Sequence, residues 1–188
     1  MIELILGGAR SGKSRLAESR INSISQNNTQ SKKSNIIYVA TATAQDDEMS
    51  ERILQHKKRR PQHWRLIEEP IQLANVLATY KQADNIVLIE CLTLWLSNLL
   101  GSNDPDVFKL EKENFIQQIQ ESEADIILVS NETGLGVVPM GELSRRYVDE
   151  AGWLHQELAQ ISDRVTLVIA GLEQTLKTPL TTDGSKHE

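Results

Sequence analysis

The chain is poor in several features that mark specialised classes of protein. Its 188 residues contain a single cysteine, Cys91, which excludes an internal disulfide and any multi-cysteine metal site. No apolar run approaches the roughly 20 residues that a membrane-spanning helix requires. The net charge of -6 gives the chain no general attraction for nucleic acid. We therefore expect neither a membrane span nor a nucleic-acid partner.

The N-terminus also lacks the basic-then-apolar layout of a signal peptide, which favours a cytoplasmic protein. Hydrophobic residues at 39% and charged residues at 24% are ordinary globular values. A chain of this length is most simply one domain that buries roughly 70% of its unfolded surface, and it contains no internal repeat. We expect one folded domain over residues 1–177, followed by a polar tail over residues 178–188.

The strongest motif follows a predicted buried strand at residues 2–6. Residues 7–14 match the phosphate-binding pattern G-x-x-x-x-G-K-[ST], and a helix from residue 13 to about 24 is predicted to begin inside it. Glycines let the backbone turn several N–H groups toward one point, where they and the positive end of the helix hold phosphate oxygens. Lys13 can then reach the β- and γ-phosphates, and the Ser14 hydroxyl is placed to bind Mg²⁺. The predicted nucleotide-binding residues are Gly7, Gly8, Ala9, Arg10, Ser11, Gly12, Lys13 and Ser14.

Apolar runs alternate with helical segments along the rest of the chain. This pattern predicts an α/β fold: a single-domain P-loop NTPase-like, doubly wound, mostly parallel sheet flanked by helices. The polar stretch 22–34 predicts a surface connection. The predicted strands are 35–40, 64–69, 85–91, 125–130 and 164–171, and the predicted helices are about 43–60, 71–80, 92–100, 106–121 and 142–161.

The ends of these strands indicate where a nucleotide would lie. In open α/β sheets the ligand lies beyond the carboxyl ends of the strands, so Ala40, Thr41 and Ala42 are expected to border it. Glu90 stands at the end of the strand 85–91, where a carboxylate resembles the acid that closes the second phosphate-binding motif, although Asp is usual there. An ion pair or a capping role for Glu90 remains an alternative.

The helix that Pro61 is expected to end carries an imidazole beside four cations. Cations favour helix C-termini, so this cluster could be a solvated basic helix end. Alternatively, the cations meet a triphosphate while His56 acts on it as a nucleophile or an acid-base group. Sequence physics alone does not choose between the two interpretations. The cations are Lys57, Lys58, Arg59 and Arg60.

Several other residues are expected to have structural roles. Cys91 stands in an apolar run and is expected to be buried. We expect His63 and Trp64 to be packing residues rather than ligands. On the helix 142–161, we expect Trp153 to pack and His155 to lie on the surface.

Two segments allow either a structural or a functional interpretation. The helix 92–100 is apolar nearly all round, which predicts a buried helix or a subunit contact. The loop 131–139 begins with polar groups and contains two glycines, so it is either a plain surface loop or the place where a second substrate enters.

The whole arrangement resembles the bifunctional adenosylcobinamide kinase / adenosylcobinamide-phosphate guanylyltransferase family of cobalamin nucleotide-loop assembly. The resemblance covers about residues 2–172, and its specific part is the combination of the phosphate loop with the His56 helix and the loop 130–132. Beyond the phosphate loop, the resemblance is carried by residues 38–42, 46–49, 52–53, 56–57, 60–61, 63–64, 68, 88–93, 129–132 and 134–139.

The resemblance implies two reactions that use GTP or ATP and Mg²⁺. A nucleoside triphosphate phosphorylates the aminopropanol hydroxyl of adenosylcobinamide, and GTP then transfers GMP to the product through a GMP-histidine intermediate, giving adenosyl-GDP-cobinamide. By position that histidine is His56, so the implied catalytic residues are His56 and Lys13. The implied nucleotide contacts are the phosphate loop, Ala40, Thr41, Ala42, Lys57, Lys58, Arg59, Arg60, Glu68 and Glu90.

The family also implies a homotrimer that binds a small-molecule corrinoid. The chain departs from some relatives in carrying Gln55 where they have a second histidine, so only one imidazole is available on this helix. The proton of the substrate hydroxyl has three candidate acceptors, Asp46, Asp47 and Glu132.

Two alternatives remain open. A phosphate-loop kinase without guanylyl transfer would carry an inert His56. A GTP-binding regulatory module would use the loop as a switch, but the chain lacks the Asn-Lys-x-Asp motif that reads guanine, and the basic cluster would then have no task.

Overall fold

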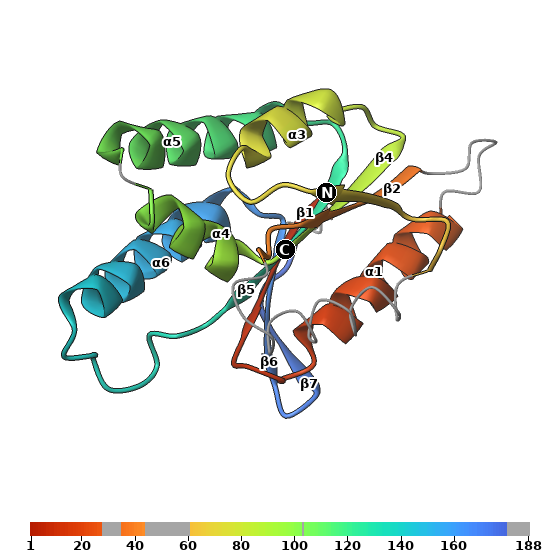
Figure 1. The fold of residues 1–188 in the computed structure, drawn as a ribbon. Coiled ribbons are helices and arrows are strands. Elements are labelled where there is room, and N and C mark those ends of the chain that lie inside the picture. The colour runs from red at the N-terminus through yellow and green to blue at the C-terminus, as the bar shows by residue number, and fades with distance from the viewer. Residues whose placement is uncertain (28–34, 44–60, 103, 180–188) are drawn as a thin grey trace, which may run out of the picture.

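The computed structural model describes residues 1–27, 35–43, 61–102 and 104–179 (Figure 1). The predicted helix 43–60 therefore lies almost wholly outside the described residues, and with it His56 and the cations Lys57, Lys58, Arg59 and Arg60. In the part of the chain that is described, no helix is both long and apolar enough to cross a membrane.

Seven strands and five helices make up the described part of the chain. The strands are β1 (Ile2–Gly7), β2 (Asn35–Ala40), β3 (Arg65–Glu68), β4 (Asn85–Glu90), β5 (Asp125–Asn131), β6 (Arg164–Ile169) and β7 (Leu172–Lys177). The helices are α1 (Lys13–Asn27), α3 (Leu73–Thr79), α4 (Leu92–Leu100), α5 (Pro105–Glu121) and α6 (Glu142–Ile161).

The strands form one sheet in the order β3-β2-β4-β5-β1-β6-β7, parallel throughout except for β7, which pairs antiparallel with β6. Helix α1 covers one face, whereas α3, α4, α5 and α6 cover the other (Figure 1). The predicted α/β class and mostly parallel sheet are therefore confirmed. Because all strands but β7 run the same way, the segments that follow β1, β4 and β5 meet at one edge of the sheet.

Each face of the sheet has its own apolar core. The larger core lies beneath α3–α6 and includes Trp95 and Phe115, whose ring centroids are 4.7 Å apart. The smaller core lies beneath α1 and includes Ile21 and Trp64. Trp95 is fully buried and donates its Nε1 hydrogen to the carbonyl of Ile71 at 2.7 Å, so α4 is a buried helix of the core.

Two parts of the fold differ from the sequence-based expectation. Helix α1 continues to Asn27, into the stretch predicted as a connection, because Leu16, Ala17, Ile21 and Ile24 keep one apolar face against the sheet. Strand β7 was not predicted, and its first five residues are all exposed. An edge strand without a buried face lacks the alternation that identifies strands in sequence.

A buried carboxylate connects the N-terminal strand to three other elements. Glu3 on β1 is fully buried and accepts hydrogen bonds from Arg20 on α1 at 3.2 Å and Thr166 on β6 at 3.0 Å. Arg20 also contacts Glu173 on β7 at 2.7 Å. Arg20 therefore both pairs with the buried charge and fastens the edge strand to α1.

Replacing Arg20 with alanine is expected to lower the free energy of unfolding by about 3 kcal/mol, because Glu3 would remain buried without its cation. Urea denaturation measures the loss. Lys109→Ala is the control, since it removes an exposed helical pair with Glu113 and should change stability by no more than about 0.5 kcal/mol. Similar small losses in both variants would contradict the role assigned to Arg20.

Candidate active site

The phosphate loop between β1 and α1 has a backbone that glycine makes possible. Gly7 and Gly12 adopt φ of 153° and 105°. A Cβ at Gly7 would lie 2.3 Å from the carbonyl oxygen of Val168, so no side chain fits there. The Gly7 carbonyl accepts the N–H of Glu132 at 3.0 Å, and the Ser11 carbonyl accepts the N–H of Gly171 at 2.9 Å. The loop is thus held from both sides, by the ends of β5 and β6.

Two polar side chains are buried within this loop. Lys13 donates to the carbonyl of Gly8 at 2.6 Å. Burial lowers the pKa of Lys13, while the charges of Cys91 and Glu90 act in the opposite direction. The Ser11 hydroxyl is buried and has no hydrogen-bond partner among the described residues. A buried cation beside an unpaired hydroxyl and a tight run of amides suits an anionic ligand such as a phosphate group.

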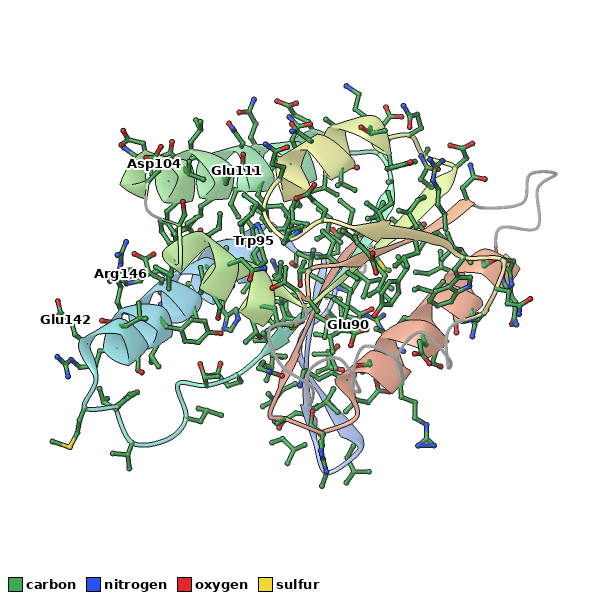
Figure 2. All side chains as sticks on the ribbon, viewed as in Figure 1. Glu90, Trp95, Asp104, Glu111, Glu142 and Arg146 are labelled. Atoms are coloured by element: carbon green, nitrogen blue, oxygen red, sulfur yellow. The ribbon has the colours of Figure 1, made fainter. Side chains whose placement is uncertain are left out.

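Glu90 faces the first turn of α1 from the end of β4. Its carboxylate accepts hydrogen bonds from the Ser14 hydroxyl and from the Tyr38 hydroxyl, the latter at 2.8 Å. Figure 2 shows Glu90 between the sheet and α1. The fold therefore brings together two predicted site residues that are 76 positions apart. Hydroxyl and carboxylate oxygens are the ligands that Mg²⁺ prefers, so Ser14 and Glu90 could hold it.

The residues after β2 support the same edge of the sheet. Thr41 is buried, and its hydroxyl donates to the carbonyl of Cys91 at 2.7 Å and accepts the Cys91 N–H at 2.9 Å. The Thr41 side chain thus ties the end of β2 to the end of β4, flanked by the half-buried Ala40 and Ala42. Cys91 itself is half-buried, and burial raises the pKa of its thiol.

Glu68 lies farther from the phosphate loop than Glu90 does. It is exposed at the end of β3, the edge strand that lies four places from β1 in the sheet. With neighbouring strands about 4.8 Å apart, that separation is about 19 Å. Contact with a phosphate in the loop is therefore out of reach for Glu68, whereas a more distant part of a nucleotide remains within reach.

Two expectations for α6 were wrong. His155 is buried and Trp153 is 54% exposed, the reverse of what was expected. The buried residues of α6 are Ala151, Leu154, His155 and Leu158, which follow the spacing of one helical face. That spacing was visible in the sequence and would have placed His155 correctly. His63 is exposed and so is not a packing residue, whereas Trp64 is buried as expected and lies 6.5 Å from the Tyr38 ring.

His155 lies in a cluster beside the phosphate loop. Its Nε2 is 2.8 Å from the Ser130 hydroxyl, and its Nδ1 is 3.7 Å from a carboxylate oxygen of Glu132. Glu132 and His155 line a mainly apolar cavity of about 350 Å³ between α6 and the sheet. The sequence pointed to Glu132 but not to its pairing with His155.

Residues 3–176 match the model of the family described as cobinamide kinase / cobinamide phosphate guanyltransferase. The chain belongs to this family. It is 54% identical over 177 residues to the bifunctional adenosylcobalamin biosynthesis protein CobP of Pseudomonas aeruginosa, covering 94% of this chain and 98% of that relative. Two bifunctional adenosylcobalamin biosynthesis proteins named CobU, from Escherichia coli and Salmonella typhimurium, are each 37% identical over 190 residues, covering 94% of this chain and all of theirs.

Among solved structures, a protein from Pyrococcus horikoshii OT3 aligns with a TM-score of 0.49 and 12% identity, over 94% of this chain and 86% of its own. That likeness is too weak to support an argument. The resemblance of the sequence to the kinase and guanylyltransferase family is confirmed by the family match and the relatives.

The burial of His155 should make the stability of this family member depend on pH. Burial lowers the pKa of His155, although Glu132 acts in the opposite direction. The unfolded chain therefore takes up a proton at a higher pH than the folded protein does. The corresponding stability is complete above the unfolded pKa of about 6.5 and is lost as the pH falls from there toward the folded pKa.

Urea denaturation between about pH 7 and pH 5 should show this loss, with a slope of at most about 1.4 kcal/mol per pH unit for one proton. His155→Gln should show a shallower slope than the wild type. His63→Gln, at an exposed position, should keep the wild-type slope. Parallel curves for wild type and His155→Gln would argue against a buried neutral imidazole.

Proposed function

We propose that the protein phosphorylates the aminopropanol hydroxyl of adenosylcobinamide with ATP or GTP and then transfers GMP from GTP to the product, giving adenosyl-GDP-cobinamide. Membership of the cobinamide kinase / cobinamide phosphate guanyltransferase family supports both reactions. The structural observation that carries the proposal is the contact of Ser14 with Glu90 beside the buried Lys13. This is the arrangement that a triphosphate and its cation need.

In the phosphoryl transfer, the chain mainly binds and orients. The amides of the phosphate loop and the Ser11 hydroxyl hold phosphate oxygens, and the Lys13 ammonium leaves the Gly8 carbonyl to reach them. Ser14 and Glu90 would hold Mg²⁺, which supplies positive charge against the phosphate oxygens. The loop amides are positioned before the nucleotide arrives, so only the Lys13 side chain has to move.

In the guanylyl transfer, His56 is the proposed nucleophile. Its neutral imidazole attacks the α-phosphorus of GTP, a P–N bond forms, and the bond to pyrophosphate breaks. The phosphate of the corrinoid product then attacks the same phosphorus and releases His56. Nearby cations from Lys57, Lys58, Arg59 and Arg60 offset the charge of departing pyrophosphate.

Intact mass after incubation with GTP and Mg²⁺ tests this step. The wild type should gain the mass of GMP in an adduct that survives denaturation and is lost in mild acid, because a phosphoramidate is acid-labile. His56→Ala should gain nothing, while His63→Ala, at an exposed histidine in the same stretch of chain, should gain the adduct fully. A chelator added before GTP should suppress the adduct.

Absence of an adduct in the wild type, with nucleotide still bound and corrinoid still phosphorylated, would favour a kinase without guanylyl transfer. Nucleotide binding with neither reaction would favour a GTP-binding regulatory module. An adduct in His56→Ala would move the nucleophile elsewhere.

The corrinoid is proposed to dock on the loop between β5 and α6. Leu135, Val137 and Met140 in this loop are 81%, 97% and 95% exposed, an unusual concentration of open apolar surface. The loop begins directly after Asn131, at the edge of the sheet that carries the phosphate loop. A large macrocycle with apolar faces could cover these side chains while its hydroxyl arm reaches the nucleotide.

Val137→Asp is expected to raise the KM for the corrinoid by roughly 10-fold, because a charge would have to be desolvated against an apolar face. The Kd for GTP should stay unchanged. Leu110→Asp on α5 replaces another exposed apolar residue and serves as the control. We also propose that the protein is a cytoplasmic homotrimer, so a neighbouring subunit is the other possible occupant of this loop. Light scattering on both variants tests this alternative. Loss of trimers in Val137→Asp alone would assign the loop to a subunit contact.

A further inference from the structure

Phosphorylation of a hydroxyl requires a group that accepts its proton. Four carboxylates stand at or just after the carboxyl ends of β3, β4 and β5 in the described chain: Glu68, Glu69, Glu90 and Glu132. Glu90 is engaged by two hydroxyls, and Glu69 accepts the N–H groups of Ile71 and Gln72 at the start of α3. Both Glu68 and Glu69 lie at the carboxyl end of β3, about 19 Å from the strand that leads into the phosphate loop.

The backbone of Glu132 lies directly against the start of the phosphate loop. Its strand, β5, lies next to β1, and its own N–H donates to the Gly7 carbonyl at 3.0 Å. Its side chain is 21% exposed, so a ligand can reach it. One carboxylate oxygen accepts the N–H of Gly134 at 2.5 Å. A carboxylate has about four acceptor sites, so this contact fixes the group and leaves it able to take a proton.

The Nδ1 of His155 faces the second carboxylate oxygen at 3.7 Å. The buried imidazole has a single N–H when neutral, and its two nitrogens face different partners. If the hydrogen is on Nδ1, it points at Glu132, and Nε2 accepts the Ser130 hydroxyl. The other tautomer would set a nitrogen lone pair against the carboxylate, which is unfavourable. At 3.7 Å the contact is a charge–dipole attraction that can shorten when substrate binds.

We propose that Glu132 is the catalytic base of the kinase step, and that His155, held by Ser130, is the positioning residue that orients its carboxylate. The inference rests on the proposed function for the existence of the kinase step. Asp46 and Asp47, the other two candidates from the sequence, lie outside the described residues.

The proton and bond balance of the step is simple. The substrate hydroxyl gives its proton to Glu132 as its oxygen bonds to the γ-phosphorus of the nucleotide. The bond between that phosphorus and the β–γ bridging oxygen breaks, and the nucleoside diphosphate leaves. Glu132 then releases the proton to solvent, and no other reactant is consumed.

Steady-state phosphorylation of adenosylcobinamide tests the base. Glu132→Gln keeps the size and the contact with Gly134 but cannot accept the proton, so kcat should fall roughly 10²- to 10⁴-fold. The Kd for the nucleotide should remain within about twofold, since the loss is in the reacting step. Glu142→Gln, at the start of α6, is the matched control and should keep the wild-type kcat.

The positioning role has a separate test. His155→Gln should lower kcat roughly 10- to 100-fold with little change in the KM for the corrinoid, because it misplaces the carboxylate without removing it. The same substitution in Glu132→Gln should have no further effect on kcat, since there is then no base to orient. Ser130→Ala should behave like a weaker form of His155→Gln.

These outcomes distinguish failure of the proposed function from failure of the roles assigned to Glu132 and His155. A wild type without kinase activity would remove the proposed function itself. An active wild type with an equally active Glu132→Gln would overturn the base assignment alone. Additive losses of kcat from the two substitutions would overturn the positioning role of His155 while leaving the base in place.

Discussion

The structure depends on the tight approach of the phosphate loop to the strands beside it. Gly7 leaves β1 with its backbone against the carbonyl of Val168 on β6, where no side chain fits, and its carbonyl accepts the amide that follows β5. These two contacts fix the loop relative to the parallel sheet. The candidate site residues of the described chain lie on this loop or near it in the sheet. Lys13 and Ser14 belong to the loop, Glu90 ends a strand two places away, and Glu132 follows the strand one place away.

The parallel sheet, the loop and the place of Glu90 could be predicted from the sequence because the local and long-range signals agree. The strands β1, β2, β4 and β5 are buried on both faces and therefore appear as continuous apolar runs. The loop motif then predicts which strand end binds phosphate. Once the sheet is known to be parallel, Glu90 must stand at the same edge as Ser14, and the fold places the two in contact. Neither step needs a tertiary structure.

The expectations that failed depend on packing between elements. A polar residue such as His155 is expected outside, but α6 turns it inward, where the Ser130 hydroxyl and the Glu132 carboxylate compensate its burial. Trp153 is apolar and was placed inside, yet the inward face was already filled by Ala151 and Leu154. Strand β7 follows a two-residue turn, Ala170 and Gly171, both at positive φ, and alanine gives little sign of such a turn.

The order of strands also bears on how one nucleotide site can serve two reactions. The segment that carries His56 leaves the sheet after β2 and returns at β3, whereas Glu132 follows β5, so the two groups are attached on opposite sides of β4. The proposed nucleophile and the proposed base therefore belong to segments that are joined to different strands. We expect both reactions to use the same phosphate loop, with the choice between them made by the acceptor that is bound.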